Sequence, residues 1–176
     1  MGVTLAAFGS GALVRGGVEA ALVADTALFE NDTLRTGEGS FAALRLVTEA
    51  TINLGPFSEI TLDAFTASLG GTLTLGGAMV FDRPDDLPPL DHTVLTAFAQ
   101  IGVRGTRFFA GPSNGVPAIF CARGVVTVTR GQARVDLGPG EGIELPDTAA
   151  GSEDRLGDVL RWSEARIAAA YASVGL

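Results

Sequence analysis

Cysteine, histidine and lysine are scarce in this chain of 176 residues, which contains one cysteine, one histidine and no lysine. The lone Cys121 excludes an internal disulfide and any zinc site built from several cysteines. Its apolar neighbours predict a buried thiol in a strand. The lone His92 cannot form a transition-metal site unaided. We therefore expect no metal site.

Positive charge is also scarce, because 12 arginines stand against 20 acidic residues and the formal net charge is -8. The backbones of nucleic acids and the surfaces of anionic membranes attract clustered cations. The charge balance therefore predicts that the chain has no nucleic-acid partner and does not bind anionic membranes.

Long apolar runs are missing, so no segment could cross a bilayer as a helix. No signal-peptide pattern is visible either. We expect no transmembrane segment in this chain. Apolar residues still make up 47% of it, which suits one domain with a sizeable core. Aromatic side chains other than phenylalanine are limited to Trp162 and Tyr171.

Glycine is abundant, with 24 residues, and it separates short runs in which apolar and polar residues alternate. "EITLDAF" places Ile60 and Leu62 on one face, and "VVTVTRG" does the same with Val126 and Val128. Alternation with a period of two is typical of strands with one buried face, and breaks such as "TGEGS" and "GPSNG" supply turns. These patterns predict an all-β domain of many short strands.

One pattern of strand, turn and strand occurs twice. Residues 50–62, "ATINLGPFSEITL", align without a gap on residues 133–145, "ARVDLGPGEGIEL". Alanine, leucine, glycine, proline, isoleucine and leucine coincide in the two segments. We expect each segment to form a strand, a Gly-Pro corner and a second strand, so that the two are structurally equivalent.

Near the middle of the chain, "FDRPDDLPPLDH" predicts a loop, because Pro84, Pro88 and Pro89 interrupt regular structure. The carboxylates between residues 82 and 91 could hold calcium, but they lack an EF-hand pattern, and a solvated acidic loop is the favoured interpretation. No change in composition marks this loop as a domain boundary.

The C-terminal residues 151–176 have a different pattern, because Ser152 can cap a helix and apolar residues follow at helical spacing. These apolar residues are Leu156, Val159, Leu160, Ile167, Tyr171 and Val174. We expect one amphipathic α-helix from Ser152 to about Val174, packed on a β-domain of residues 1–150. The alternative is that its apolar stripe is a partner site or the seam of a dimer.

No catalytic set stands out in the sequence. "GPSNG" (111–115) matches G-x-S-x-G, but a strand pattern follows it instead of a helix, so we expect a hairpin loop with an inert Ser113. "GSGALVRGG" does not complete the dinucleotide-binding motif G-x-G-x-x-G. The carboxylates show no spacing that singles out an acid/base pair. We expect no enzymatic activity and no cofactor.

The stretch "IGVRGTRFF" leaves two interpretations for its Arg104-Gly105-Thr106 core: a phosphate cradle, or a bend between two strands. A phosphate cradle needs a helix after the glycine, and none is predicted there. A bend needs only a backbone conformation that other residues resist. We favour the bend, with Arg104 bonded to oxygens of its own chain.

Two stretches, "LFENDTLRTGEGSFAALRL" and "TAFAQIGVRGTRFFAG", resemble the two signatures of the FecR domain family. "INLGPFSEITLD" and "ARGVVTVTRGQARVDLGPGEGIEL" resemble the sections that continue them, and the resemblance covers roughly residues 3–146. It implies an extracytoplasmic bacterial domain with the form of a coiled, solenoid-like β-sandwich. The residues that match at the structural motifs of the signatures are Thr36, Gly37, Arg104, Gly105 and Thr106.

In the best-known members of this family, the domain relays an iron-uptake signal from a TonB-dependent receptor to a cytoplasmic anti-sigma segment. The resemblance implies a non-enzymatic module, periplasmic or secreted after removal of a signal peptide, that binds an unknown protein of the envelope. The alternative is a carbohydrate- or cell-wall-binding or adhesin-like structural module. A protein-binding module should expose a strand edge or an apolar patch, whereas a glycan-binding module should expose a groove with aromatic side chains.

Overall fold

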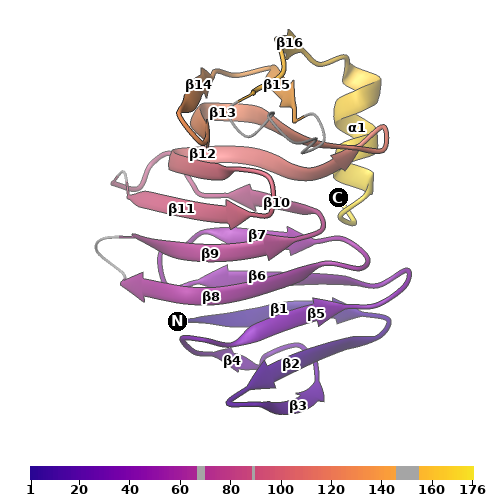
Figure 1. Cartoon of the computed structure of the whole chain (residues 1–176). Coiled ribbons are helices and arrows are strands. Elements are labelled where there is room, and N and C mark those ends of the chain that lie inside the picture. The colour runs from indigo at the N-terminus through magenta and orange to yellow at the C-terminus, as the bar shows by residue number, and fades with distance from the viewer. Residues whose placement is uncertain (67–69, 89, 146–154) are drawn as a thin grey trace.

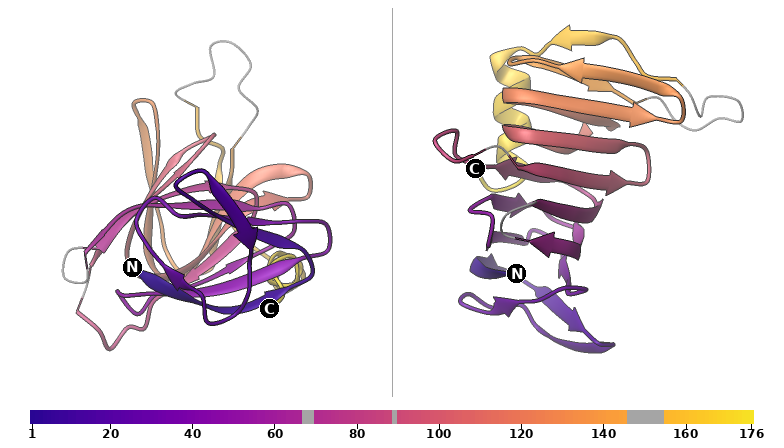
Figure 2. Two further views of the ribbon diagram at one scale, coloured as in Figure 1. Left: turned by 90° about the horizontal axis from the view of Figure 1, so that it is seen from below. Right: turned by 90° about the vertical axis from the view of Figure 1, so that its left-hand side faces the viewer.

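The computed structural model describes residues 1–66, 70–88, 90–145 and 155–176. Within these ranges the chain forms one open sheet of 16 strands, followed by a short helix (Figure 1). The strands stack from the N-terminal end to the C-terminal end as a coil, and the sheet folds back on itself to enclose a core (Figure 2). The predicted coiled all-β sandwich, with helix only near the C-terminus, is confirmed.

The sheet has two facing walls, which follow from the order β3-β2-β5-β8-β9-β11-β12-β10-β7-β6-β1-β4. The first wall contains the strands that precede β12 in this order: β3 (Val18–Ala21), β2 (Gly11–Arg15), β5 (Thr33–Thr36), β8 (Glu59–Thr66), β9 (Gly70–Gly76) and β11 (Asp91–Thr96). The second wall contains those that follow it: β10 (Met79–Asp82), β7 (Thr51–Leu54), β6 (Phe41–Leu46), β1 (Gly2–Phe8) and β4 (Ala27–Leu28).

Two long strands, β12 (Gln100–Ser113) and β13 (Val116–Arg130), belong to both walls. The first part of β12 pairs with β11 and its later part pairs with β10. The register between β12 and β13 shifts between Arg104 and Arg107, where β12 crosses from the first wall to the second. The Arg104-Gly105-Thr106 stretch therefore lies at a bend between two walls.

Three further strands extend the walls beyond β13. β14 (Ala133–Leu137) pairs with the first-wall part of β13, whereas β15 (Glu141–Glu144) pairs with its second-wall part. β16 (Val159–Arg161) then pairs with β15 at the C-terminal end of the coil. The repeated strand, corner and strand are thus present both as β7–β8 and as β14–β15.

Side chains that alternate along the strands form two hydrophobic clusters on opposite faces of the second wall. The larger cluster lies between the walls and includes Leu44, Ile60 and Val128, which are fully buried. Burial of each such side chain stabilises the fold by about 1.5–3 kcal/mol. The smaller cluster lies outside the second wall and consists of Ala78, Val80, Phe109, Ala118, Phe120, Trp162, Ala170 and Val174.

The C-terminal helix is much shorter than the sequence pattern predicts. α1 spans Glu164–Ala172, and Ser163 is its N-cap, with a hydroxyl that accepts a hydrogen bond from the Arg166 amide. The predicted cap, Ser152, lies outside the described residues. The prediction was wrong for the segment ahead of Ser163, because this segment contains a strand.

Val159 and Leu160 belong to β16 and are 37% and 55% exposed, so they do not form the apolar stripe of a helix. Their helical spacing is overridden because the free edge of β15 offers backbone hydrogen bonds to an extended segment. Gly157 favours this arrangement, since a Cβ there would lie 2.2 Å from the carbonyl oxygen of Glu144.

Candidate functional site

The Thr36 hydroxyl holds one edge of the sandwich together, at the edge where β5 leads into β6 and β7 leads into β8. This hydroxyl is buried, donates to the Gly55 carbonyl at 2.6 Å and accepts from the Ser58 amide at 2.9 Å. The Ser58 hydroxyl extends the network, because it accepts from the Ala78 amide at 2.9 Å. Hydroxyl groups therefore satisfy the backbone at successive corners of this edge.

Gly37 lies at the same edge, where its lack of a side chain allows the Ser10 residue to pack closely against the backbone. Its amide donates to the Ser10 carbonyl at 2.8 Å, and a Cβ at Gly37 would lie 2.2 Å from the Ser10 hydroxyl oxygen. The Ser10 amide in turn donates to the Ser40 hydroxyl at 2.9 Å. Thr36 and Gly37 therefore join β5, the corner after β7 and the turn after β1 by hydrogen bonds and close packing.

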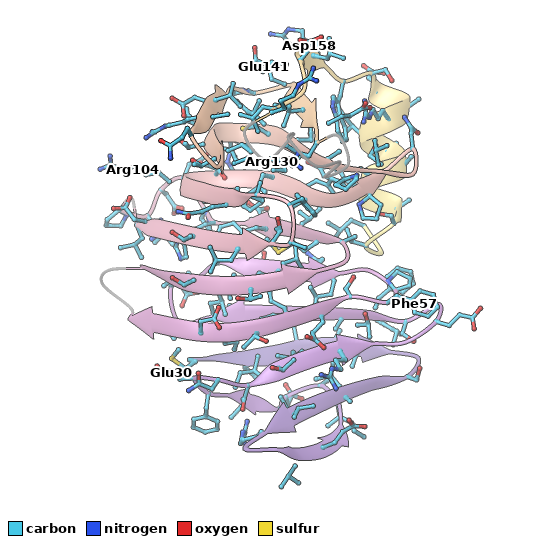
Figure 3. All side chains as sticks on the ribbon, viewed as in Figure 1. Glu30, Phe57, Arg104, Arg130, Glu141 and Asp158 are labelled. Carbon is cyan, nitrogen blue, oxygen red and sulfur yellow. The ribbon has the colours of Figure 1, made fainter. Side chains whose placement is uncertain are left out.

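Arg104 and Thr106 lie at the opposite edge, so the structure does not bring the two signature motifs together. Thr106 is buried and its carbonyl accepts from the Arg83 amide at 3.1 Å. Arg104 points out of the molecule (Figure 3), with a side chain that is 72% exposed. Its Nε atom lies 3.9 Å from the Asp91 carboxylate, a loose contact that leaves the guanidinium open to solvent.

Near this second edge, the buried polar residues Arg83, Thr48 and His92 form a hydrogen-bonded network. Nε of Arg83 donates to the Thr48 carbonyl at 3.0 Å, and the Thr48 hydroxyl lies 3.1 Å from Nε2 of His92. Burial lowers the pKa of His92 to about 4, and the positive charge of Arg83 acts in the same direction. The imidazole is therefore neutral near pH 7 and packs edge-on against Phe81, with the ring centroids 5.2 Å apart.

Neither candidate nucleophile is activated. Ser113 ends β12 at a hairpin, as predicted, and its hydroxyl accepts from Nε of Arg166 at 3.0 Å. A guanidinium cannot serve as the base that a serine nucleophile needs. Burial raises the pKa of the Cys121 thiol to about 11, so this buried thiol stays protonated.

The acidic loop after β10 is held mainly by arginine. The guanidinium of Arg123 contacts the carboxylates of Asp82 at 2.9 Å and Asp85 at 2.6 Å. Among the described residues, no group of three or more histidine, cysteine or acidic side chains could hold a metal ion.

α1 covers the C-terminal part of the outer face of the second wall (Figure 1). Trp162, which precedes the helix, stacks on Phe120 with the ring centroids 4.9 Å apart. Arg166 lies over the other side of the indole at 3.9 Å and pairs with Glu144 at 2.8 Å. Arg107 similarly lies 4.9 Å from the centre of the Tyr171 ring. These contacts fix α1 to the sheet.

The same outer face continues past the C-terminal end of α1 without such a cover. Gly175 packs on the Phe41 ring, and beyond it lies a hollow of about 70 Å³ whose walls include Ala6, Ala43 and Phe8. Phe8 pairs directly with Phe41 across β1 and β6, and its side chain is 69% exposed. We call Phe8, Phe41 and Phe57 the phenylalanine strip; Phe57 belongs to the corner after β7, the strand that pairs with β6.

Phe57 is the most unusual member of the phenylalanine strip. Its side chain is 72% exposed, and its backbone has a φ of 51°, in the left-handed region. This conformation is a clear outlier for a bulky residue, and it costs on the order of 1–3 kcal/mol. The exposed ring gains nothing from the core, so the fold alone does not account for a phenylalanine at this position.

The sequence pattern does not predict the phenylalanine strip, because the Gly-Pro corner within residues 50–62 indicates only a turn. The available signal was the residue after proline in a Gly-Pro-x-Ser turn, where glycine or asparagine is the usual choice. Phe8 and Phe41 gave no signal, because only the pairing of β1 with β6 places them side by side.

The fold defines the chain as a coiled β-sandwich domain whose strands form two walls. The FecR protein family matches residues 32–134, more than half of the sequence, and the chain belongs to this family. The suspected relationship is therefore confirmed. Comparison with curated proteins gives no match.

Two crystal structures of a proposed anti-sigma factor from Parabacteroides distasonis are similar to this chain, each with a TM-score of 0.59. The sequence identities are 19% and 18%. In each case the similarity covers 75% of this chain and 59% of the other, so this chain spans little more than half of the length of those relatives. At this identity the likeness supports the fold alone. No helix among the described residues is long and apolar enough to cross a membrane.

Proposed function

We propose that this FecR-family domain is a non-enzymatic, extracytoplasmic signalling module that works by binding another protein of the bacterial envelope. Membership of the family supports a regulatory role, and the proposed anti-sigma factor of similar fold points the same way. The proposed location is the periplasm or the cell exterior.

The observation that carries the protein-binding proposal is Phe57, which is exposed and held in a strained backbone conformation. Strain that the fold does not require points to a function of the residue itself. Phe8 and Phe41 pair across β1 and β6 and add apolar surface next to the end of the chain after α1, and aromatic residues are enriched in the buried centres of protein interfaces. The proposed site of the partner is therefore the phenylalanine strip.

The continuation of α1 suggests how a partner would bind. The C-terminal part of the outer face of the second wall already buries Ala170 of α1 and Val174, which follows the helix. The uncovered part next to it has a floor of small side chains, Ala6 and Ala43, beside the exposed ring of Phe8. An amphipathic helix of the partner, placed end to end with α1, would bury these groups in the same way.

The alternative, in which the domain acts mainly as an adhesin-like module or binds neutral glycans, has less support. Binding of neutral sugars relies on exposed aromatic rings that line a groove. The polar groove over β11, β12, β13 and β14 has no aromatic ring in its lining apart from the buried His92, and both Trp162 and Tyr171 pack against the sheet.

Capture from an envelope extract with paired variants tests the proposed function. The double variant Phe8→Thr and Phe57→Asn removes two rings, and each new residue suits its backbone, since threonine favours strands and asparagine tolerates positive φ. The variant should retain its melting temperature and lose a protein that the wild type captures.

Val18→Thr is the matched control, because Val18 is 70% exposed on the terminal strand β3, away from the phenylalanine strip. It should capture the partner as the wild type does. Equal capture by the wild type and the double variant would refute the strip as the binding site. Loss in both variants would point instead to the terminal edge of the sheet.

A further inference from the structure

The first wall carries a second, separate surface feature: a polar groove of about 440 Å³ on its outer face. It lies over β11, β12, β13 and β14, on the opposite side of the molecule from α1 (Figure 1). The lining residues on which the argument rests are Thr93, Gln100, Gly102, Arg104, Thr127 and Arg134.

Gly102 forms the floor of the polar groove, and the fold does not require a glycine there. A Cβ at this position would meet only Thr127, at an ordinary contact distance of 3.7 Å. A glycine inside a strand is destabilising by about 0.5–1 kcal/mol relative to alanine. The residues opposite it on both neighbouring strands are threonines, Thr93 and Thr127. The missing side chain therefore hollows the sheet between two hydroxyl groups.

Two exposed arginines stand at the ends of this hollow. Arg104 pairs with Val125 and Arg134 pairs with Thr129, so the two are offset by four residues, about 13 Å along the strand direction. Their side chains are 72% and 67% exposed. Each lies only 3.9 Å from one carboxylate, Asp91 for Arg104 and Asp136 for Arg134, which leaves donors free on both guanidinium groups.

The chemistry of the polar groove favours one class of ligand. β11, β12 and the first-wall part of β13 are paired on both sides beneath the groove, so an extended peptide finds an unpaired strand edge only at β14, on the rim. Threonine hydroxyls and the Gln100 amide can instead bind a ligand rich in hydroxyl groups, and guanidinium groups pair with carboxylates. Thr127 already donates to Asp136 at 2.6 Å, so its hydroxyl remains an acceptor for the ligand.

We infer that the polar groove binds an oligosaccharide with carboxylate groups, such as a short uronic acid chain. Arg104 and Arg134 bind two acid groups, and Gly102 leaves room for a sugar ring between them. This inference goes beyond the proposed protein-binding function and uses the other face of the molecule. It also gives the exposed Arg104 a role that its position outside the core does not supply.

Calorimetric titration with trigalacturonic acid, at low salt, tests this inference on the whole chain. The wild type should bind, and binding should weaken as salt is added, because exposed charges are screened. Arg104→Gln and Arg134→Gln should each weaken binding at least tenfold. Gly102→Val should abolish binding without lowering the melting temperature, since the side chain fills the hollow.

Arg35→Gln is the matched control, because Arg35 is also exposed on the first wall and pairs with Glu59 outside the groove. It should bind as the wild type does. Absence of binding to the wild type, or undiminished binding to Gly102→Val, would overturn the inference. Equal binding of a neutral trisaccharide or of triglutamate would overturn the assigned ligand class. The Phe8 and Phe57 double variant should keep full binding, which separates this test from that of the proposed function.

Discussion

The two segments that share the strand, corner and strand pattern, 50–62 and 133–145, have the same local form in opposite settings. In the first segment, β7 of the second wall leads into β8 of the first, whereas β14 of the first wall leads into β15 of the second. The aligned side chains are buried in the same core: Leu54 with Leu137, Ile60 with Ile143, and Leu62 with Leu145. The pattern therefore sets the corner, and the neighbours decide which edge it crosses.

The two corners differ at the residue after proline, where the first has Phe57 and the second has Gly140. Both have positive φ, 51° and 85°, and both amides donate to the next layer, to Gly37 at 3.3 Å and to Cys121 at 2.8 Å. Gly140 is covered by Arg161, which a Cβ would approach to 2.9 Å. A bulky ring is thus found only where the corner faces solvent, which supports a role for Phe57 outside the fold.

Removal of the cover over the second segment should have the largest effect on stability. In the second segment, Trp162 lies against Gly142 and covers it. The residue of the first segment that aligns with Gly142 is Glu59, and its side chain is exposed. Trp162→Ala should lower the free energy of unfolding by about 4 kcal/mol, because it empties a buried aromatic site. Glu59→Ala should change it by less than about 0.5 kcal/mol. Chemical denaturation measures both, and equal effects would contradict the difference between the segments.

Removal of the hydroxyl that supports the first corner should have the next largest effect. Thr36→Val leaves the Gly55 carbonyl and the Ser58 amide without this partner, which should cost about 3 kcal/mol. Thr33→Val, on the same strand, disturbs only a partly buried hydroxyl pair with Thr61 and should be nearly neutral. If thermal melts show similar losses for both variants, the corner network is not the cause.

A fall in pH should destabilise the second edge, where His92 is buried, but not the first edge, whose hydroxyl network does not titrate in this range. The pKa of His92 is lowered to about 4 in the folded protein from an ordinary 6.5, so the unfolded chain binds the proton more readily. The stability that the neutral imidazole provides is present above pH 6.5 and is lost as the pH falls toward 4. The total loss is at most about 3 kcal/mol.

His92→Gln keeps a polar partner for Thr48 and does not titrate. Unfolding free energies measured between pH 7 and 4 should therefore vary less for this variant than for the wild type. Parallel curves for the two proteins would show that another group dominates acid sensitivity in this range.

Exchange of the two corner residues should have the smallest effects, and they should be opposite in sign. Phe57→Gly should stabilise the protein by about 1 kcal/mol, because glycine adopts positive φ freely. Gly140→Phe should destabilise it by about 2 kcal/mol or less, since it adds the same strain and displaces Arg161. A loss of stability in Phe57→Gly would show that the ring supports the fold, and would remove the main support for the phenylalanine strip as a binding site.

Much of the fold could be predicted from the sequence, because alternation and glycine punctuation are local consequences of burying one face of each strand. The hairpin at Ser113 and the buried strand around Cys121 follow from the same patterns. The segment around Val159 was mispredicted as helix, since its spacing suits a helix and only the free edge of β15 makes it a strand. The roles of the signature residues could be only partly predicted, because Arg104 starts the bend but its side chain is exposed and contacts Asp91 only loosely.

The all-β class, the family and the two repeated corners can be inferred from residue types at short spacing, because each depends on local pattern. Which distant residues meet depends on how the strands pair. This pairing places Phe8 beside Phe41 and hollows the first wall at Gly102 between Thr93 and Thr127. The physical reason is that strand register, which local pattern does not specify between distant strands, sets which side chains share a face of the sheet.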